Sequence, residues 1–424
     1  MRFFYFLIIC FWSTFCNAQD YPELVNTPPI FVKEVDISLL KENQLYIAMP
    51  FAKKIVLNPE QKQQLSEKVI IKLELVYTKY RKSNSFNQKK LNHNRLKELN
   101  RLAPSIFENR FWEFQLTSQT KAKSRETGNK MFHGFVVTFR PSSTKQTLKK
   151  EASYLSDLVN TMLKTDSLVN DTLPQVFHLG KVRYDPNKGY LRDTIWRKDT
   201  VALLPPPAFF YNHSLYNDST VLNSFSRNKN WKNFIIVTDV TGSMSPYSAQ
   251  VFVWLKEQAE NKLAQCFVFF NDGDEKPSRK KLPLETKGIY VTKSSGLEDV
   301  VNTAKKCMNN GSGGGENLEN DIESILDGIK HHPGANEVIL IADNMESMRD
   351  YKFLKQIKKP VHVILCGAEN RINIQYLDLA RQTKGSVHTK NADIINLQDI
   401  KEKEHFFIEE KEYLYENGRF HFVY

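Results

Sequence analysis

The chain has 424 residues, a formal net charge of +11, a hydrophobic share of 41% and an aromatic share of 12%. This composition is that of a globular protein and excludes a disordered chain. The length allows two or three domains and easily supports sizeable cores. Beyond the first residues no segment approaches about 20 consecutive apolar residues, so we expect no transmembrane segment in the mature chain.

The first residues have the pattern of a secretory signal peptide. Met1-Arg2 precedes the apolar run 3–11, which is too short to span a bilayer comfortably, and Cys16-Asn17-Ala18 resembles a cleavage site. We therefore expect residues 1–18 to be removed. The mature protein is then secreted, periplasmic or located in the cell envelope.

Residues 19–202 are expected to form an α+β region of no family that we recognise. Asn58-Pro59-Glu60 predicts a helix start, and the apolar residues that follow extend this helix to about Tyr80. Further helices are predicted over 91–102 and 153–163, and strands over 111–116 and 134–139. Residues 203–230 contain three consecutive prolines followed by polar residues, which is typical of a linker.

Much of the positive charge lies in residues 76–150, which hold about 17 Lys and Arg against about four acids. Such a region attracts acidic partners, among them an anionic surface. A solvated lysine-rich face is the plainer interpretation. We expect no nucleic-acid binding, because the segment has neither zinc-finger spacing nor an RNP-type strand.

A short apolar run, 234–237, ends in Thr238 and Asp239 and is followed by Thr241 and Ser243. Apolar β-formers without alternation indicate a buried parallel strand. The polar residues then lie at its carboxyl end, where open α/β sheets bind their ligands. A carboxylate and two hydroxyls are hard oxygen donors that suit Mg²⁺, Mn²⁺ or Ca²⁺. A strand-to-helix turn with a capping hydroxyl is the alternative.

The same theme returns downstream. A glycine-rich loop, 311–320, opens an amphipathic run, 322–329, and a second buried strand then ends at Asp343. A third strand over 361–367 and a helix over 376–380 follow. Cys266 and Cys366 lie in predicted strands, where thiols behave as small buried hydrophobes.

This order of elements resembles the von Willebrand factor A (VWA) domain with its metal-ion-dependent adhesion site. The family motif D-x-[ST]-x-S maps onto Asp239, Thr241 and Ser243, and the acid after the later strand maps onto Asp343. The resemblance covers residues 231–400. It implies an α/β fold with a doubly wound, mostly parallel sheet, and a divalent cation, with Mg²⁺ first and Ca²⁺ or Mn²⁺ as alternatives. Residues 401–424 are a C-terminal extension.

The middle loop departs from the usual family pattern. Many members place a threonine ligand there, whereas the only hydroxyl of this loop is Ser312. The loop resembles the subset that reads GGGD-x-PE, with Glu316 at the acidic position and Glu319 at the later acid. Glu316 is then a fifth candidate ligand. Its alternative role is to cap the following helix, and Ser312 or Asn317 are the other residues for the middle-loop position.

The resemblance implies a binding protein and not an enzyme. We expect the cation to engage an acidic group of a macromolecular partner. One alternative is a structural VWA scaffold whose cation only stabilises the fold. A hydrolase with catalytic groups in residues 19–202 is disfavoured, since no Ser-His-Asp order, HExxH or paired-acid motif is found there.

Overall fold

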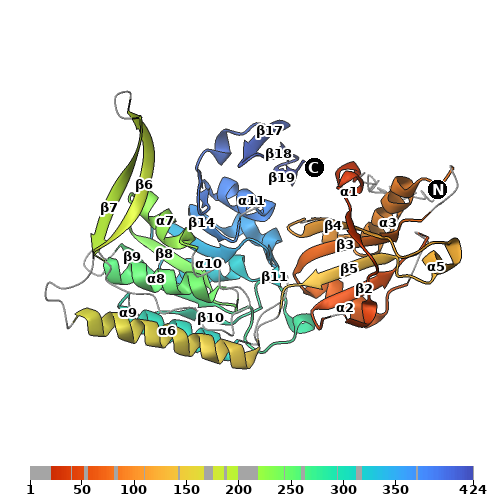
Figure 1. Ribbon diagram of the computed structural model, residues 1–424. Coiled ribbons are helices and arrows are strands. Elements are labelled where there is room, and N and C mark those ends of the chain that lie inside the picture. The colour runs from red at the N-terminus through yellow and green to blue at the C-terminus, as the bar shows by residue number, and fades with distance from the viewer. Residues whose placement is uncertain are drawn as a thin grey trace, which may run out of the picture. The chain divides into compact units, whose positions relative to one another are not determined.

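The computed structural model describes residues 21–423, apart from 40, 52–55, 81–84, 109, 142–143, 167–174, 186–188, 199–217, 243, 259–262, 294, 312–317 and 369–370. The fold is mixed α/β, with sheets that contain parallel strands (Figure 1). Two compact units divide the chain: unit 1 is 1–66 with 70–139 and 424, and unit 2 is 67–69 with 140–423. In the described residues, no helix has the length and apolar character needed to cross a membrane.

Unit 1 is a five-stranded sheet with helices, and its strand order is β1-β4-β3-β5-β2. The pairs β1–β4 and β3–β4 are parallel, and β3–β5 and β2–β5 are antiparallel. Its elements are α1 Pro22–Asn26, β1 Ile30–Val32, β2 Gln44–Ala48, α2 Pro59–Glu67, β3 Ile70–Thr78, α3 Gln88–Leu102, α4 Ser105–Glu108, β4 Glu113–Gln119, α5 Arg125–Asn129 and β5 Gly134–Phe139.

Four elements are predicted before residue 140: three of them are present, and the fourth, the helix from Pro59 to about Tyr80, is correct only at its start. The helix that begins at Pro59 ends at Glu67, and the residues that we assigned to its continuation form β3. The segment alternates apolar and polar side chains through Leu73, Glu74 and Leu75, which suits a strand. Pairing with β4 and β5 on both sides makes β3 the centre of the sheet. The segment therefore forms a strand, because pairing with two neighbouring strands outweighs its helix-compatible spacing of apolar residues.

Unit 2 is built on a seven-stranded sheet of order β10-β9-β8-β12-β14-β15-β16. The inner pairs are parallel, and the edge strands β10 and β16 are antiparallel to their neighbours. The strands are β8 Phe234–Asp239, β9 Ala264–Phe270, β10 Ile289–Val291, β12 Glu337–Asp343, β14 Val361–Cys366, β15 Ser386–His388 and β16 Asp393–Ile394. The strands predicted at 234–239 and 338–343 are thus confirmed, and the one predicted at 361–367 is present and ends one residue earlier, at Cys366.

Helices cover both faces of this sheet. Alternate residues of its buried strands therefore belong to two separate hydrophobic cores, one on each face. Ile236 packs with α6, α7, α8 and α9, whereas Val237 packs with α10 and α11. The helices are α6 Lys145–Asp166, α7 Thr220–Arg227, α8 Ser245–Glu257, α9 Leu297–Asn310, α10 Asp321–His331 and α11 Ile374–Thr383. Cys266 and Cys366 are buried free thiols in β9 and β14, as predicted.

Smaller sheets complete unit 2. A hairpin joins β6 Gln175–Asp185 to β7 Gly189–Lys198, and the short parallel pair is β11 Leu318–Glu319 with β13 Ser347–Met348. The C-terminal extension forms an antiparallel sheet of β17 Glu404–Ile408, β18 Lys411–Glu416 and β19 Arg419–Phe422. Helix α7 lies within the range 203–230 predicted as a linker, and the predicted signal peptide lies outside the described residues.

Gly328 allows α10 to lie close to the sheet. A Cβ at this position would lie 3.0 Å from Val268 Cγ2 and 3.3 Å from Ile235 Cγ2. These are buried side chains of β9 and β8, so they have little room to yield.

We predict that Gly328→Val destabilises the protein by about 1–3 kcal/mol, because a branched side chain overpacks this contact. The measurement is the free energy of unfolding in urea. Gly334→Ala is the matched control, since a Cβ at Gly334 meets nothing within 4 Å. Equal effects of the two substitutions would contradict the close approach of α10.

Candidate functional site

Asp239 is the last residue of β8, and Thr241 fixes its carboxylate. The Thr241 backbone N–H donates to Asp239 Oδ1 at 2.7 Å, and the Thr241 hydroxyl donates to Oδ2 at 3.0 Å. These bonds turn the chain sharply between β8 and α8. Two of the predicted ligands are thereby in contact, whereas Ser243 and Glu316 lie outside the described residues.

Asp343 is the last residue of β12, which is the parallel neighbour of β8. The two acids therefore lie at the same carboxyl edge of the sheet, as the sequence predicts. Both oxygens of Asp343 have partners: Oδ1 accepts from the Met345 N–H at 2.9 Å, and Oδ2 accepts from Arg140 Nη1 at 2.6 Å. The ion pair with Arg140 is buried.

Two glutamates complete an acidic cluster at this edge. Glu319 ends β11 and Glu346 directly precedes β13, and the parallel pairing of these two strands brings the glutamates together. Asp239, Glu319 and Glu346 each offer a carboxylate oxygen, and these oxygens lie within 4.8 Å of one another. We call these three residues the acidic triad.

The acidic triad is withdrawn from solvent. Asp239, Glu319 and Glu346 are 1%, 2% and 1% exposed. Two of the buried oxygens, Glu319 Oε2 and Glu346 Oε2, have no hydrogen-bond partner among the described residues. Asp321, the first residue of α10, is also fully buried. Neither of its carboxylate oxygens has a hydrogen-bond partner among the described residues. Unpartnered buried carboxylate oxygens are costly, so this edge needs positive charge or protons.

The pKa values of the three acids in the acidic triad are all raised. Burial raises the pKa of Asp239 to about 8, and the charges of Asp343 and Asp321 act in the same direction, against the hydrogen bonds from Thr241. Burial and the neighbouring Glu346 raise the pKa of Glu319 well above its usual range. Burial also raises the pKa of Glu346, although Arg140 opposes this shift. Burial thus disfavours the charged forms of all three acids of the acidic triad.

The acidic triad fits a divalent cation. Its donors are carboxylate oxygens only, which suit Mg²⁺, Ca²⁺ or Mn²⁺ and not a thiolate-binding metal. Glu319 Oε2 and Glu346 Oε2, which have no partner in the part of the chain that the structure describes, can coordinate a cation, and the Thr241 hydroxyl lies beside Asp239. Of the five predicted ligands, the structure places Asp239, Thr241 and Asp343 at this edge, with Asp343 held by Arg140.

The sequence predicts only part of this site. Its pattern marks Glu319 as the later acid of the loop without making it a ligand, and it assigns no role to Glu346 or Arg140. The signal for Glu346 is its position three residues after Asp343. Arg140 gives no local signal, because its partner Asp343 lies 203 residues further along the chain.

Comparisons with protein-family models, with curated proteins and with solved structures found no match to this chain.

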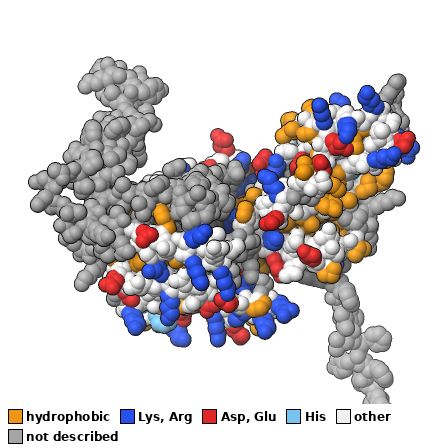
Figure 2. All heavy atoms as spheres, turned by 60° about the horizontal axis from the view of Figure 1, so that its bottom comes forward, with side chains coloured by type: hydrophobic (Ala, Val, Ile, Leu, Met, Phe, Trp, Pro, Cys, Tyr) orange, Lys and Arg blue, Asp and Glu red, His pale blue; other side chains and the backbone are white. Residues whose placement is uncertain are grey.

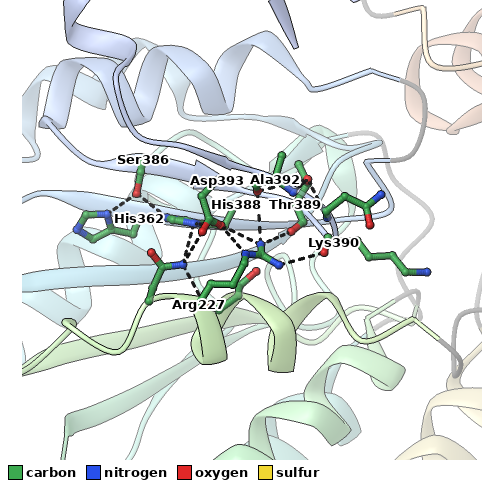
Figure 3. A network of polar contacts seen from close by, with 11 residues as sticks. Arg227, His362, Ser386, His388, Thr389, Lys390, Ala392 and Asp393 are labelled. Atoms are coloured by element: carbon green, nitrogen blue, oxygen red, sulfur yellow. Dashed lines mark hydrogen bonds and ion pairs between the residues drawn. The ribbon is translucent and has the colours of Figure 1, made fainter. Parts of the chain in front are cut away.

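A second polar network lies at the side of the same sheet that ends in β15 and β16 (Figure 3). Ser386 Oγ lies 2.5 Å from His388 Nε2 and 2.6 Å from His362 Nδ1, and His388 Nδ1 lies 2.8 Å from Asp393 Oδ1. Arg227 of α7 donates from Nε and Nη2 to the same Asp393 oxygen. A neutral His388 that donates from Nδ1 to Asp393 can accept from Ser386 at Nε2.

The contacts Ser386–His388–Asp393 follow the order of a hydrolase triad, but this network connects elements of the fold. Ser386 and His388 are 4% and 0% exposed, so a substrate has no access to Ser386 Oγ. Burial lowers the pKa of His388 to about 4, although the hydrogen bond to Asp393 opposes this shift. Burial acts to raise the pKa of Asp393, but hydrogen bonds from Arg227 and His388 lower it overall. The network links α7 to β15 and β16.

We predict that Asp239→Asn and Glu319→Gln each lower the affinity for Mn²⁺ or Mg²⁺ by about tenfold or more, because each removes a charged ligand. Isothermal titration calorimetry measures this affinity. Glu337→Gln is the matched control, since Glu337 begins the strand that Asp343 ends and lies at its opposite end. An unchanged isotherm for Glu319→Gln would remove this residue from the ligand set.

We predict that His388 makes the protein less stable as pH falls from about 6.5 to about 4. The unfolded chain binds the proton in this window and the folded chain does not, so stability is lost on acidification. The full difference is about 3 kcal/mol. Urea unfolding at pH 7 and pH 4 measures it, and His388→Gln should show a smaller loss. Equal losses in the two proteins would show that His388 does not titrate in this way.

Proposed function

We propose that this protein is a secreted or envelope-located binding protein whose unit 2 resembles a VWA domain and holds one divalent cation. The observation that carries the proposal is the acidic triad at the carboxyl edge of the parallel strands, with two buried oxygens that lack partners among the described residues. The central parallel strands between two helix-covered faces support a doubly wound architecture.

The acidic triad, when ionised, carries three negative charges, and a divalent cation supplies two positive charges to it. Arg140 adds one more positive charge beside Asp343 and Glu346. Lys281 and Arg349 supply further positive charge by pairing with Asp272. Asp321 still lacks a partner within the described residues. The charge balance at this edge thus favours a bound cation over an empty acidic cluster.

In this proposal the cation-loaded edge recognises an acidic group of a macromolecular partner. A partner's carboxylate can complete the coordination of a cation that keeps an open position, and it adds a strong charge-assisted contact. Mg²⁺ is the first choice because the family resemblance implies it, and Ca²⁺ or Mn²⁺ are the alternatives; Ca²⁺ in particular accepts more carboxylate ligands.

The burial of the acidic triad favours a second candidate function. A cation that is held by three nearly inaccessible carboxylates has little access for a partner, and its charge is already balanced by its ligands. Such a cation stabilises the fold and fixes the loops at the carboxyl edge. In this scaffold function, partner binding uses other surfaces.

The basic residues 76–150 belong to both units, and those of unit 1, 76–139, are a second candidate for contact with acidic partners. Part of their charge is internal to unit 1: Arg95 is buried and donates to the carbonyls of Met49 and Pro50, and Arg110 pairs with Glu23. Lys79, Lys89 and Lys90 are exposed, whereas Arg81 and Lys82 lie outside the described residues. Figure 2 shows Lys and Arg side chains spread over the visible face with Asp and Glu among them.

Affinity capture from the native envelope, with and without chelator, tests the two candidate functions. For the binding function we expect wild type to retain a partner with Mg²⁺ or Mn²⁺ present and to lose it with chelator. Glu319→Gln should retain less partner than the control Glu337→Gln. Both variants are to be checked for folding by circular dichroism.

The other outcomes separate the alternatives. Partner retention that ignores chelator, together with a melting temperature that rises with cation, supports the scaffold function. Retention and melting temperature that both ignore the cation would contradict the cation site itself.

A further inference from the structure

Arg140 is the one group of this edge that carries positive charge directly onto the acidic triad, as far as the described residues show. Its Nη1 donates to Asp343 Oδ2 at 2.6 Å, and its Nη2 donates to Glu346 Oε1. The guanidinium is buried, as are both carboxylates. Such a forked contact to two carboxylates fits the fixed geometry of arginine and is stronger than a surface ion pair.

The contact occupies oxygens that a cation would use. Asp343 Oδ2 is held by Arg140 and Oδ1 by the Met345 N–H, so Asp343 has no oxygen without a partner. Glu346 keeps only Oε2 for the acidic triad. A divalent cation among Asp239, Glu319 and Glu346 would also lie next to a guanidinium of like charge, in a buried place where repulsion is screened poorly.

We propose that Arg140 is a built-in competitor of the divalent cation, which holds Asp343 and Glu346 in the cation-free protein and lowers the affinity of the site. This inference rests on the cation-binding function proposed above. Arg140 keeps two buried acids neutralised when the cation is absent, so the edge folds without it. The cation must then displace or repel the guanidinium, and the site binds its cation weakly and reversibly.

If Arg140 has a purely structural role, its removal should lower the cation affinity instead of raising it. If the guanidinium served to hold Glu346 in place for the cation, its removal would leave Glu346 misplaced and would weaken binding. A competitor, once removed, strengthens binding, because a positive charge leaves and carboxylate oxygens are released. The direction of the change in cation affinity therefore decides between the two roles.

The test is calorimetric titration of Mn²⁺ and Mg²⁺ into the full chain with Arg140→Gln, Arg140→Lys and wild type. We expect Arg140→Gln to bind at least about tenfold more tightly than wild type. Arg140→Lys keeps the charge but cannot hold two carboxylates in the same fork, so a smaller increase is expected. Arg227→Gln is the matched control: it removes an arginine from a carboxylate in the network of Figure 3 and should leave the affinity unchanged.

Thermal unfolding gives a second measurement. Arg140→Gln should melt at a lower temperature than wild type without cation, because it leaves two buried acids without their counter-charge, and it should gain more from added cation. If Arg140→Gln does not fold without cation, the competitor role predicts that cation restores its fold, and Arg140→Lys provides the titration.

Failures of the two proposals are distinguishable. Equal or weaker binding by both Arg140 variants, with binding by wild type, would overturn the competitor role and leave the cation site standing. No binding by wild type or by either variant would contradict the cation site and the inference together. Binding by Arg140→Gln alone would support the competitor role in its strongest form.

Discussion

Unit 2 is organised around the burial of several carboxylates at one edge of a parallel sheet. Parallel strands direct their carboxyl ends to a common edge, and here β8 and β12 both end in aspartate. The β11–β13 pair adds Glu319 and Glu346 to the same place. Like charges in a buried site repel one another and lose their hydration, so this arrangement is stable only with counter-charges, protons or a cation.

The positively charged side chains are distributed unevenly among these acids. Arg140 forms ion pairs with Asp343 and Glu346, and Lys281 and Arg349 form ion pairs with Asp272. Glu319, Glu346 and Asp321 keep oxygens without partners among the described residues, and burial raises the pKa values of all three. The same physics connects the proposed cation, which supplies the missing charge, with Arg140, which supplies part of it when the cation is absent.

The sequence predicts the strands of this edge well and its charge balance poorly. The buried runs that form β8, β12 and β14 are recognisable because they lack alternation, and they place Asp239 and Asp343 at strand ends. Glu319 and Glu346 meet through two strands of two residues each, which leave no hydrophobic pattern. Arg140 reaches Asp343 across 203 residues of sequence, which local patterns do not encode. In unit 1, the apolar positions of β3 fit both a helix and a strand, and only the pairing of β3 with β4 and β5 makes it a strand.

The most direct measurement of the central claim is the position of Mn²⁺ in crystals of the full chain, located by its anomalous scattering. We expect one peak within coordination distance of Asp239, Glu319 and Glu346, with the Arg140 guanidinium moved away from Glu346 relative to cation-free crystals. Mn²⁺ bound elsewhere, or no peak at a concentration that saturates a weak site, would contradict a cation at the acidic triad.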